Sequence, residues 1–222
     1  MNGVTLQARR LRQGNRSQPA HPAPAVWAAC LPAIAILAIL PVPTATAEEY
    51  VITAGDKHNL VIFESSAPLE TFEGKSHEVS GFVNLDPSSL ADSIVIEVKA
   101  DLASLDTGIG LRNKHMRENH LETETYPHAV FRGGRILETS RNALGPGEPV
   151  TLKVRGEMEL HGVKRDLIVP VEAAMEDDGR LKITARFDIA LPDYEIDRPK
   201  FLMLKLNEVQ KVTVDLVLVR KS

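Results

Sequence analysis

From residue 50 onward, hydrophobic and polar residues alternate along the chain with a period of two. Ile94, Ile96 and Val98 fall on one side of an extended segment, while Glu97 and Lys99 fall on the other. This alternation predicts strands that are buried on one face only. The pattern predicts eight strands, over residues 60–63, 79–85, 94–102, 128–132, 150–160, 163–173, 181–191 and 212–218.

Turn-forming residues separate successive strands, as His161-Gly162 and residues 177–179 illustrate. Such close spacing favours an antiparallel meander. Gly133-Gly134 interrupts a strand pattern and predicts a β-bulge. Residues 111–121 lack the period of two and favour a short helix, inserted at one end of the sheet.

Eight antiparallel strands with one apolar face each can bury those faces in a sandwich or in a closed barrel. A closed barrel has no free edges, and eight strands can enclose one small ligand. We therefore expect an all-β fold, an extended eight-stranded antiparallel barrel with a short helical insertion. Its inner face is mostly Val, Ile, Leu, Ala and Gly, so we expect an under-filled interior. The residues expected to face it are Ile94, Ile96, Val98, Phe131, Leu152, Val154, Met158, Leu167, Val169, Phe187 and Ile189.

The first 47 residues differ from the rest. They hold four arginines and no acidic residue, then an apolar run over residues 26–40 and the small-residue end Ala45-Thr46-Ala47. These are the three parts of a cleavable signal peptide, with cleavage expected after Ala47. The run is shorter than the roughly 20 residues that cross a bilayer, and Pro32 interrupts it. We expect export to the periplasm or the medium, no stable membrane insertion after cleavage, and one mature domain over residues 48–222.

Net charge limits the possible partners of the protein, and cysteine content shows what can stabilise it. The chain has 26 basic and 30 acidic residues; four of the basic ones lie in the leader, so the mature chain carries a formal charge of −8. This balance argues against nucleic acid and against electrostatic binding to anionic lipids. The single cysteine, Cys30, lies in the leader, so the mature domain depends on its core and not on disulfides. The sequence leaves a homodimer open.

Several segments together resemble the YceI-like family. They are Tyr50-Val-Ile-Thr near the mature start, residues 72–74, 80–87, 104–108 and 112–116, Tyr126-Pro127 before Phe131, and residues 156–164, which read Gly-Glu-Met-Glu-Leu-His-Gly-Val-Lys. The resemblance spans nearly the whole mature chain and implies a lipocalin-like barrel exported to the periplasm. It also implies binding of a long isoprenoid lipid or a quinone in the barrel interior. Residues 191–199 look like a variant of the family's last hairpin, which leaves pocket length and ligand identity open.

Arg112 and His115 are the polar candidates for the ligand's head group. They follow residues 106–108, where a strand gives way to a loop that we expect at the barrel mouth. Arg112 could donate paired hydrogen bonds to head-group oxygens. It could equally bond Asp106 or a backbone carbonyl and pin the insertion in place. Both roles remain open at the level of the sequence.

Two other classes of function are compatible with parts of the sequence. A packed barrel could act through its outer surface, as an interaction or stress-response module. A hydrolase or metal-dependent enzyme could use His115 and His120, but their i, i+5 spacing does not place both imidazoles on one helical face. The chain also lacks a Gly-x-Ser-x-Gly motif. We therefore expect a binding or carrier protein that is not an enzyme and needs no cofactor.

Overall fold

The computed structural model describes residues 47–67, 70–90, 93–198, 200–201 and 204–221. The signal peptide thus falls outside the described residues, apart from Ala47, and remains a prediction. No helix of the described part is long and apolar enough to cross a membrane. The elements are β1 (Glu48–Ile52), β2 (Leu60–Ala67), β3 (Glu70–Ser76), β4 (Val79–Leu85), β5 (Ser93–Asp101), α1 (Gly110–Asn119), β6 (His128–Thr139), β7 (Val150–Leu160), β8 (Val163–Met175), β9 (Leu181–Ala190), the 3-10 helix η1 (Leu191–Tyr194), β10 (Lys200–Phe201), β11 (Leu204–Lys205) and β12 (Val209–Arg220).

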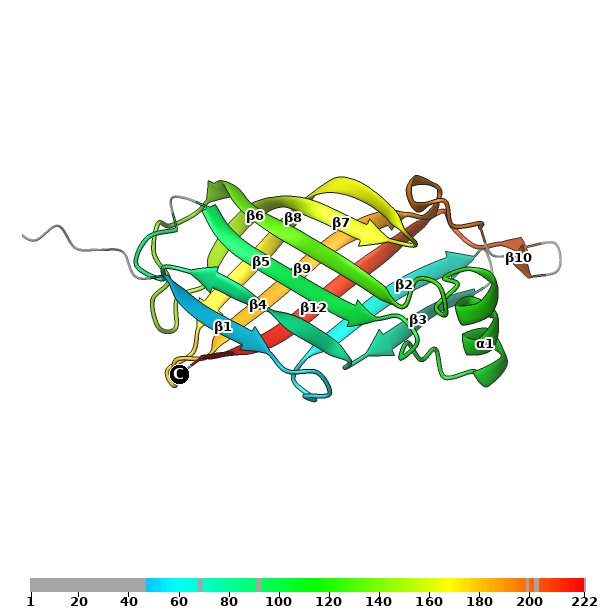
Figure 1. Cartoon of the computed structure of the whole chain (residues 1–222), viewed down its shortest axis with the longest axis horizontal. Coiled ribbons are helices and arrows are strands. Elements are labelled where there is room, and N and C mark those ends of the chain that lie inside the picture. The colour runs from blue at the N-terminus through cyan, green and yellow to red at the C-terminus, as the bar shows by residue number, and fades with distance from the viewer. Residues whose placement is uncertain (1–46, 68–69, 91–92, 199, 202–203, 222) are drawn as a thin grey trace, which may run out of the picture. The chain divides into compact units, whose positions relative to one another are not determined.

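Eight wall positions close into an antiparallel barrel (Figure 1). Around the wall the order is β1, β4, β5, β6, β7, β8, β9 and β12, and β12 pairs with β1 to complete the ring. β2 continues β1 along the same edge of β12, because residues 60–64 pair with 211–215. β3 pairs with β2 and leads into β4. The predicted eight-stranded barrel is confirmed, with two of its wall positions each built from two shorter strands.

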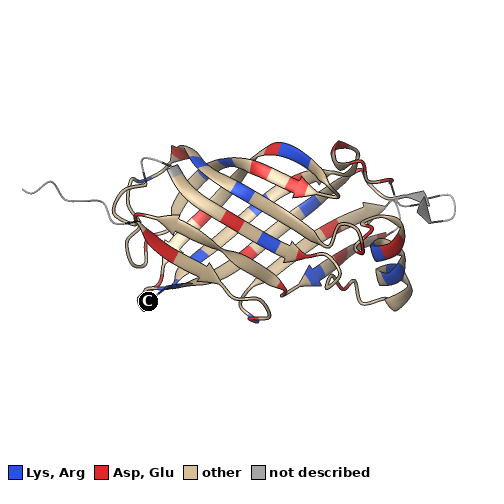
Figure 2. Cartoon of the chain, viewed as in Figure 1, with Lys and Arg blue, Asp and Glu red and all other residues tan. Residues whose placement is uncertain are grey.

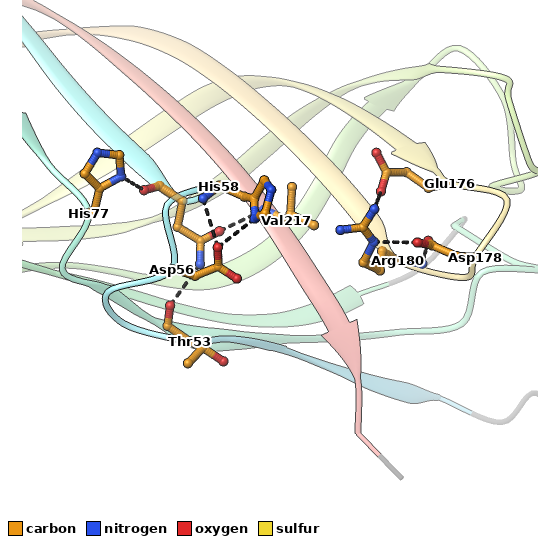
Figure 3. A network of polar contacts seen from close by, with 9 residues as sticks. Thr53, Asp56, His58, His77, Glu176, Asp178, Arg180 and Val217 are labelled. Atoms are coloured by element: carbon orange, nitrogen blue, oxygen red, sulfur yellow. Dashed lines mark hydrogen bonds and ion pairs between the residues drawn. The ribbon is translucent and has the colours of Figure 1, made fainter.

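A loop over residues 53–59 breaks the wall between β1 and β2, and Asn59 bridges the break. Its side chain is fully buried; Oδ1 accepts a hydrogen bond from the Val217 backbone N–H on β12 (2.9 Å), and Nδ2 donates to the Thr53 carbonyl (3.0 Å). His77 Nδ1 lies 2.6 Å from the Asn59 carbonyl oxygen, where β3 gives way to β4. Figure 3 shows these polar contacts. They satisfy backbone groups that the interrupted ladder would leave unpaired.

The local predictions for turns, bulge and helix agree with the structure. His161 and Gly162 join β7 to β8 with φ angles of 53° and 74°, which a two-residue type I′ hairpin turn requires. The register between β6 and β7 shifts after Gly133, at the predicted bulge. The predicted helix forms as α1 and ends at Asn119, because His120 leaves the helical region with φ −126°.

The two faces of the wall differ as the alternation predicts. On β7, Leu152 and Val154 are buried, whereas Lys153 and Arg155 are exposed. Figure 2 shows basic and acidic residues interspersed along the strands in this view. Burying each large aliphatic side chain stabilises the barrel by about 1.5–3 kcal/mol, so the inward faces hold the fold together.

Two leucines from loops close the end of the barrel that lies away from α1 (Figure 1). Leu90 follows β4 and Leu144 precedes β7, and both are buried. Their loops are tied to each other, because the Leu90 N–H donates to the Asn142 carbonyl (2.7 Å) and the Leu144 N–H donates to the Pro87 carbonyl (2.8 Å). This end is therefore a closed base.

The wall has one open seam. β8 pairs with β7 along its length, but with β9 only over residues 171–175 and 181–185. Residues 163–170 of β8 and 186–190 of β9, all of them described, form no ladder with each other. Pro170 fits this arrangement because it has no N–H to donate. The seam lies in the half of the barrel nearer to α1.

Candidate functional site

The barrel encloses a cavity of about 810 Å³. This volume lies within the usual range for small-molecule sites. Its wall is formed by the inward side chains of β2, β4, β5, β6, β7, β8, β9 and β12. At the base it is lined by Leu90, Leu144 and Leu181, and at the other end by residues of α1. The interior is thus a blind, apolar lumen that opens beside α1.

Two glycines keep the lumen open by making room for phenylalanines in the wall. Gly74 of β3 lies opposite Phe63 of β2, and a Cβ at Gly74 would stand 2.1 Å from Phe63 Cε1. Likewise, a Cβ at Gly156 would stand 2.5 Å from Phe131 Cζ. Each ring therefore lies against a glycine, in space that a Cβ would occupy. Each ring occupies the space that a side chain at the glycine would otherwise fill. The ring therefore projects less far into the lumen.

A buried asparagine shapes the mouth. Asn113 of α1 accepts hydrogen bonds at Oδ1 from the backbone N–H (2.8 Å) and Oγ1 (2.7 Å) of Thr107. Its Nδ2 donates to Asp106 Oδ1 (2.6 Å), which also accepts from the Gly108 N–H (2.8 Å). These bonds hold the pKa of Asp106 below its usual range. The loop before α1 is thereby fixed against the helix.

Arg112 joins this fixed loop to β3. Its Nε and Nη2 donate to Thr107 Oγ1 (3.0 Å) and to the Thr107 carbonyl (2.9 Å), and its Nη1 donates to Glu70 Oε1 (2.8 Å). The guanidinium also lies over the Phe72 ring, 3.9 Å from the centroid. Arg112 therefore pins the insertion, as one of its two expected roles requires. It also lines the cavity, with two of its five N–H groups not used in these bonds.

The polar lining gathers near the mouth. Among the described residues, the polar side chains that line the cavity are Ser65, Glu70, Arg112, His115, His120 and Gln210. Ser65 is buried, and its Oγ has no hydrogen-bond partner within the described part of the chain. The same holds for Nδ1 of His120. We call these six residues the polar ring; it contains donors and acceptors that a bound head group could satisfy.

Nearly all of the predicted lumen residues line this cavity. They are Ile94, Ile96, Val98, Phe131, Leu152, Val154, Met158, Val169, Phe187 and Ile189, together with Arg112 and His115 at the mouth. Leu167 differs: it lines a separate, shallower hollow at the seam between β8 and β9. It still packs against the buried cluster that includes Met158 and Ile189, at the point where β8 and β9 do not pair.

The two histidines considered for enzymatic chemistry both line the mouth, and His115 is exposed while His120 is half-buried. Burial lowers the pKa of His120, and Asp197 opposes that shift. No group of three or more His, Cys, Asp or Glu side chains in the described ranges is arranged to hold a metal ion. The mouth therefore offers hydrogen-bonding groups to a ligand.

Several lining residues were not singled out from the sequence. Ser65 belongs to the inward face of β2, and the alternation with Val61 and Phe63 could have identified it. Gln210 lies on β12, two residues before the predicted start of that strand at residue 212. Ile109 and Leu111 flank the start of α1, where no period-two signal exists.

Comparisons with known proteins agree with this architecture. Residues 50–218 match the family model described as a YceI-like domain. A polyisoprenoid binding domain from Saccharophagus degradans, implicated in plant cell wall breakdown, is 18% identical; the match covers 79% of this chain and 100% of that one, with a TM-score of 0.58. BcnA of Burkholderia cenocepacia is 20% identical, with 72% and 95% covered and a TM-score of 0.59. No curated protein matches the chain.

Proposed function

The chain belongs to the YceI-like family, and from that premise we propose that its barrel binds and carries an apolar lipid with an isoprenoid-type tail, either a free isoprenoid lipid or a quinone. The observation that carries the proposal is the blind lumen of about 810 Å³ with polar side chains near its mouth. A similar fold in a polyisoprenoid binding domain supports the choice of ligand class. The proposal requires no catalytic group.

The lumen suggests how the ligand would lie. Each methylene moved from water into an apolar site contributes about 0.8 kcal/mol, so a tail of about ten carbons gives useful affinity after the cost of association. The base, closed by Leu90 and Leu144, suits the end of the tail. The polar ring suits the head group, since Ser65 Oγ and His120 Nδ1 are buried without a partner among the described residues.

We further propose that the carrier works in the periplasm or outside the cell. The support is the sequence of residues 1–47, with its basic start, apolar run and small-residue end. A lipid carrier is useful there because isoprenoid tails are insoluble in the aqueous space that they must cross. N-terminal sequencing of the protein recovered from the periplasm or the medium would test both the location and the cleavage after Ala47.

Native mass spectrometry of the purified mature protein, followed by solvent extraction, tests the ligand. We expect a bound mass that extraction releases and that identifies as an isoprenoid lipid or quinone. In Val154→Asp a carboxylate enters the apolar lumen, because Val154 is 1% exposed and lines the cavity. This variant is expected to lose the ligand or to unfold.

The matched control is Thr151→Asp, which places the same carboxylate on the exposed face of β7. It should fold and retain the ligand. A mature protein that neither contains a lipid nor takes one up from an added quinone would contradict the carrier proposal. It would favour a barrel that acts through its outer surface.

A further inference from the structure

The mouth of the lumen carries exposed apolar side chains. Ile109, just before α1, is 50% exposed, and Leu111, in its first turn, is 65% exposed. Both also line the cavity. At this point apolar side chains therefore reach from the lining of the lumen to the outside of the molecule.

Other exposed apolar residues do not share this property. Val95 on β5 and Val219 on β12 are similarly exposed, at 56% and 55%, but neither lines the cavity. Val219 lies near the C-terminal end of β12, at the other end of the barrel from α1 (Figure 1). Single exposed apolar residues are normal on protein surfaces. What distinguishes Ile109 and Leu111 is that they join the outer surface to the lumen.

We infer that the mouth, at Ile109 and Leu111, docks on a lipid bilayer, so that a lipid passes between bilayer and lumen without crossing water. This inference rests on the proposed function, since the bilayer is the source and destination of such a ligand. The attraction is apolar. The mature chain is acidic, and the side chain of Arg112 at the mouth is already bonded to Glu70 and Thr107. Docking therefore does not depend on anionic lipids.

Flotation with phosphatidylcholine vesicles tests the inference, with the ligand-free mature protein. Wild type is expected to float with the vesicles, with little change between low and high salt, because the contact is apolar. Leu111→Asp is expected to lower the partition coefficient about tenfold, since it replaces an apolar contact with a charge. Val219→Asp is the matched control and should float like wild type. Equal flotation of the two variants would overturn the inference, and so would binding that requires anionic lipid.

A second measurement reports the contact between the mouth and the bilayer directly, without removing an apolar side chain. The mature chain has no tryptophan, because Trp27 lies in the leader. Leu111→Trp and Val219→Trp therefore each create a single fluorescent reporter. On addition of vesicles, the emission of the Leu111→Trp variant should shift to the blue and be quenched by brominated lipid, whereas that of Val219→Trp should not respond. Unchanged emission from the Leu111→Trp variant would refute docking through the mouth.

The two proposals fail separately. If the protein loads a quinone but wild type does not float, bilayer docking is wrong and the carrier function stands. If it neither contains nor takes up lipid, yet Leu111→Asp abolishes flotation, the carrier function is wrong and the mouth is still a membrane contact. Flotation only in the presence of a second protein would show that a protein partner occupies this surface, and would also overturn the inference.

Discussion

At the scale of single residues, the lumen depends on glycines in the wall as much as on the side chains that face it. Phe63 and Phe131 are two of only six phenylalanines in the chain. Each would fill part of the lumen if its ring pointed along the usual inward direction. Their positions against Gly74 and Gly156 explain why an apolar inner face does not become a packed core.

Gly74→Ala is expected to narrow the lumen. The new Cβ would overlap the Phe63 ring, which is the group nearest to it, so the ring must leave the wall. Phe63 lines the cavity, and the ring therefore moves into the space for the tail. Native mass spectrometry should show lower lipid occupancy or shorter bound tails, at a stability cost of about 1–3 kcal/mol. Gly145→Ala is the control, since its Cβ would meet nothing within 4 Å. Unchanged occupancy and tail length in Gly74→Ala would contradict this account.

His120 is expected to make stability depend on pH. Burial lowers its pKa, and His115 adds to the shift, while Asp197 opposes it. The unfolded chain, with an imidazole pKa of about 6.5, then binds more protons than the folded protein as the pH falls. The folded state therefore loses stability as the pH drops below about 6.5, until the lowered pKa of His120 is passed. Urea unfolding at pH 7.5 and 5.5 should show a smaller loss for His120→Asn than for wild type. An equal loss in both proteins would mean that His120 does not contribute.

At the scale of elements, the alternation predicts a strand well when both of its faces follow the rule. β7 has the predicted bounds, because its apolar and polar residues alternate without exception. β4 also has the predicted bounds, although Phe82 departs from its alternation. β3 was not predicted, since its buried positions include Gly74 and Ser76, which carry no apolar signal. The break at Asn59 was missed for another reason: its partner Val217 is distant in the sequence, and no local pattern links them.

In the site, too, features set by a residue's own strand could be predicted, and features set by contacts between distant segments could not. The inward residues of β5, β7 and β9 line the cavity as the alternation predicts, because a side chain's face follows from its own strand. Leu167 lies at the seam hollow instead, where β8 does not pair with β9, and this gap in the pairing has no signal in the sequence of either strand. The amount of empty space was equally beyond the sequence, since it depends on contacts such as that of Gly74 with Phe63.

The seam between β8 and β9 is expected to be the least protected part of the wall. Amides that point into the seam from residues 163–170 and 186–190 have no partner on the facing strand. Hydrogen exchange detected by mass spectrometry should therefore be faster in these segments than in residues 171–175 and 181–185, which form the ladder. Slow exchange throughout β8 and β9 would show that the seam is closed in solution.

At the scale of the whole molecule, the packing is divided into two regions. One cluster, which includes Val79, Leu90 and Leu181, closes the base, and a second, which includes Leu160 and Tyr194, lies toward the mouth. The lumen is lined by residues of both. The chain has a single cysteine, Cys30, so no disulfide within the chain can reinforce the barrel. The stability of the barrel therefore depends on these packed side chains.

Removing the ligand is expected to lower the melting temperature, because a ligand that binds only the folded state stabilises it by mass action. At a free concentration about 100 times Kd the gain is about 2.7 kcal/mol, which for a domain of this size corresponds to about 5–10 °C. Solvent-extracted and refolded protein should melt lower by this amount and recover when an isoprenoid quinone is added. Val154→Asp, if folded, should show no recovery, because its lumen carries a charge. If wild type melts at the same temperature with and without the quinone, the lumen does not bind it, since tight binding to the folded state alone requires the shift.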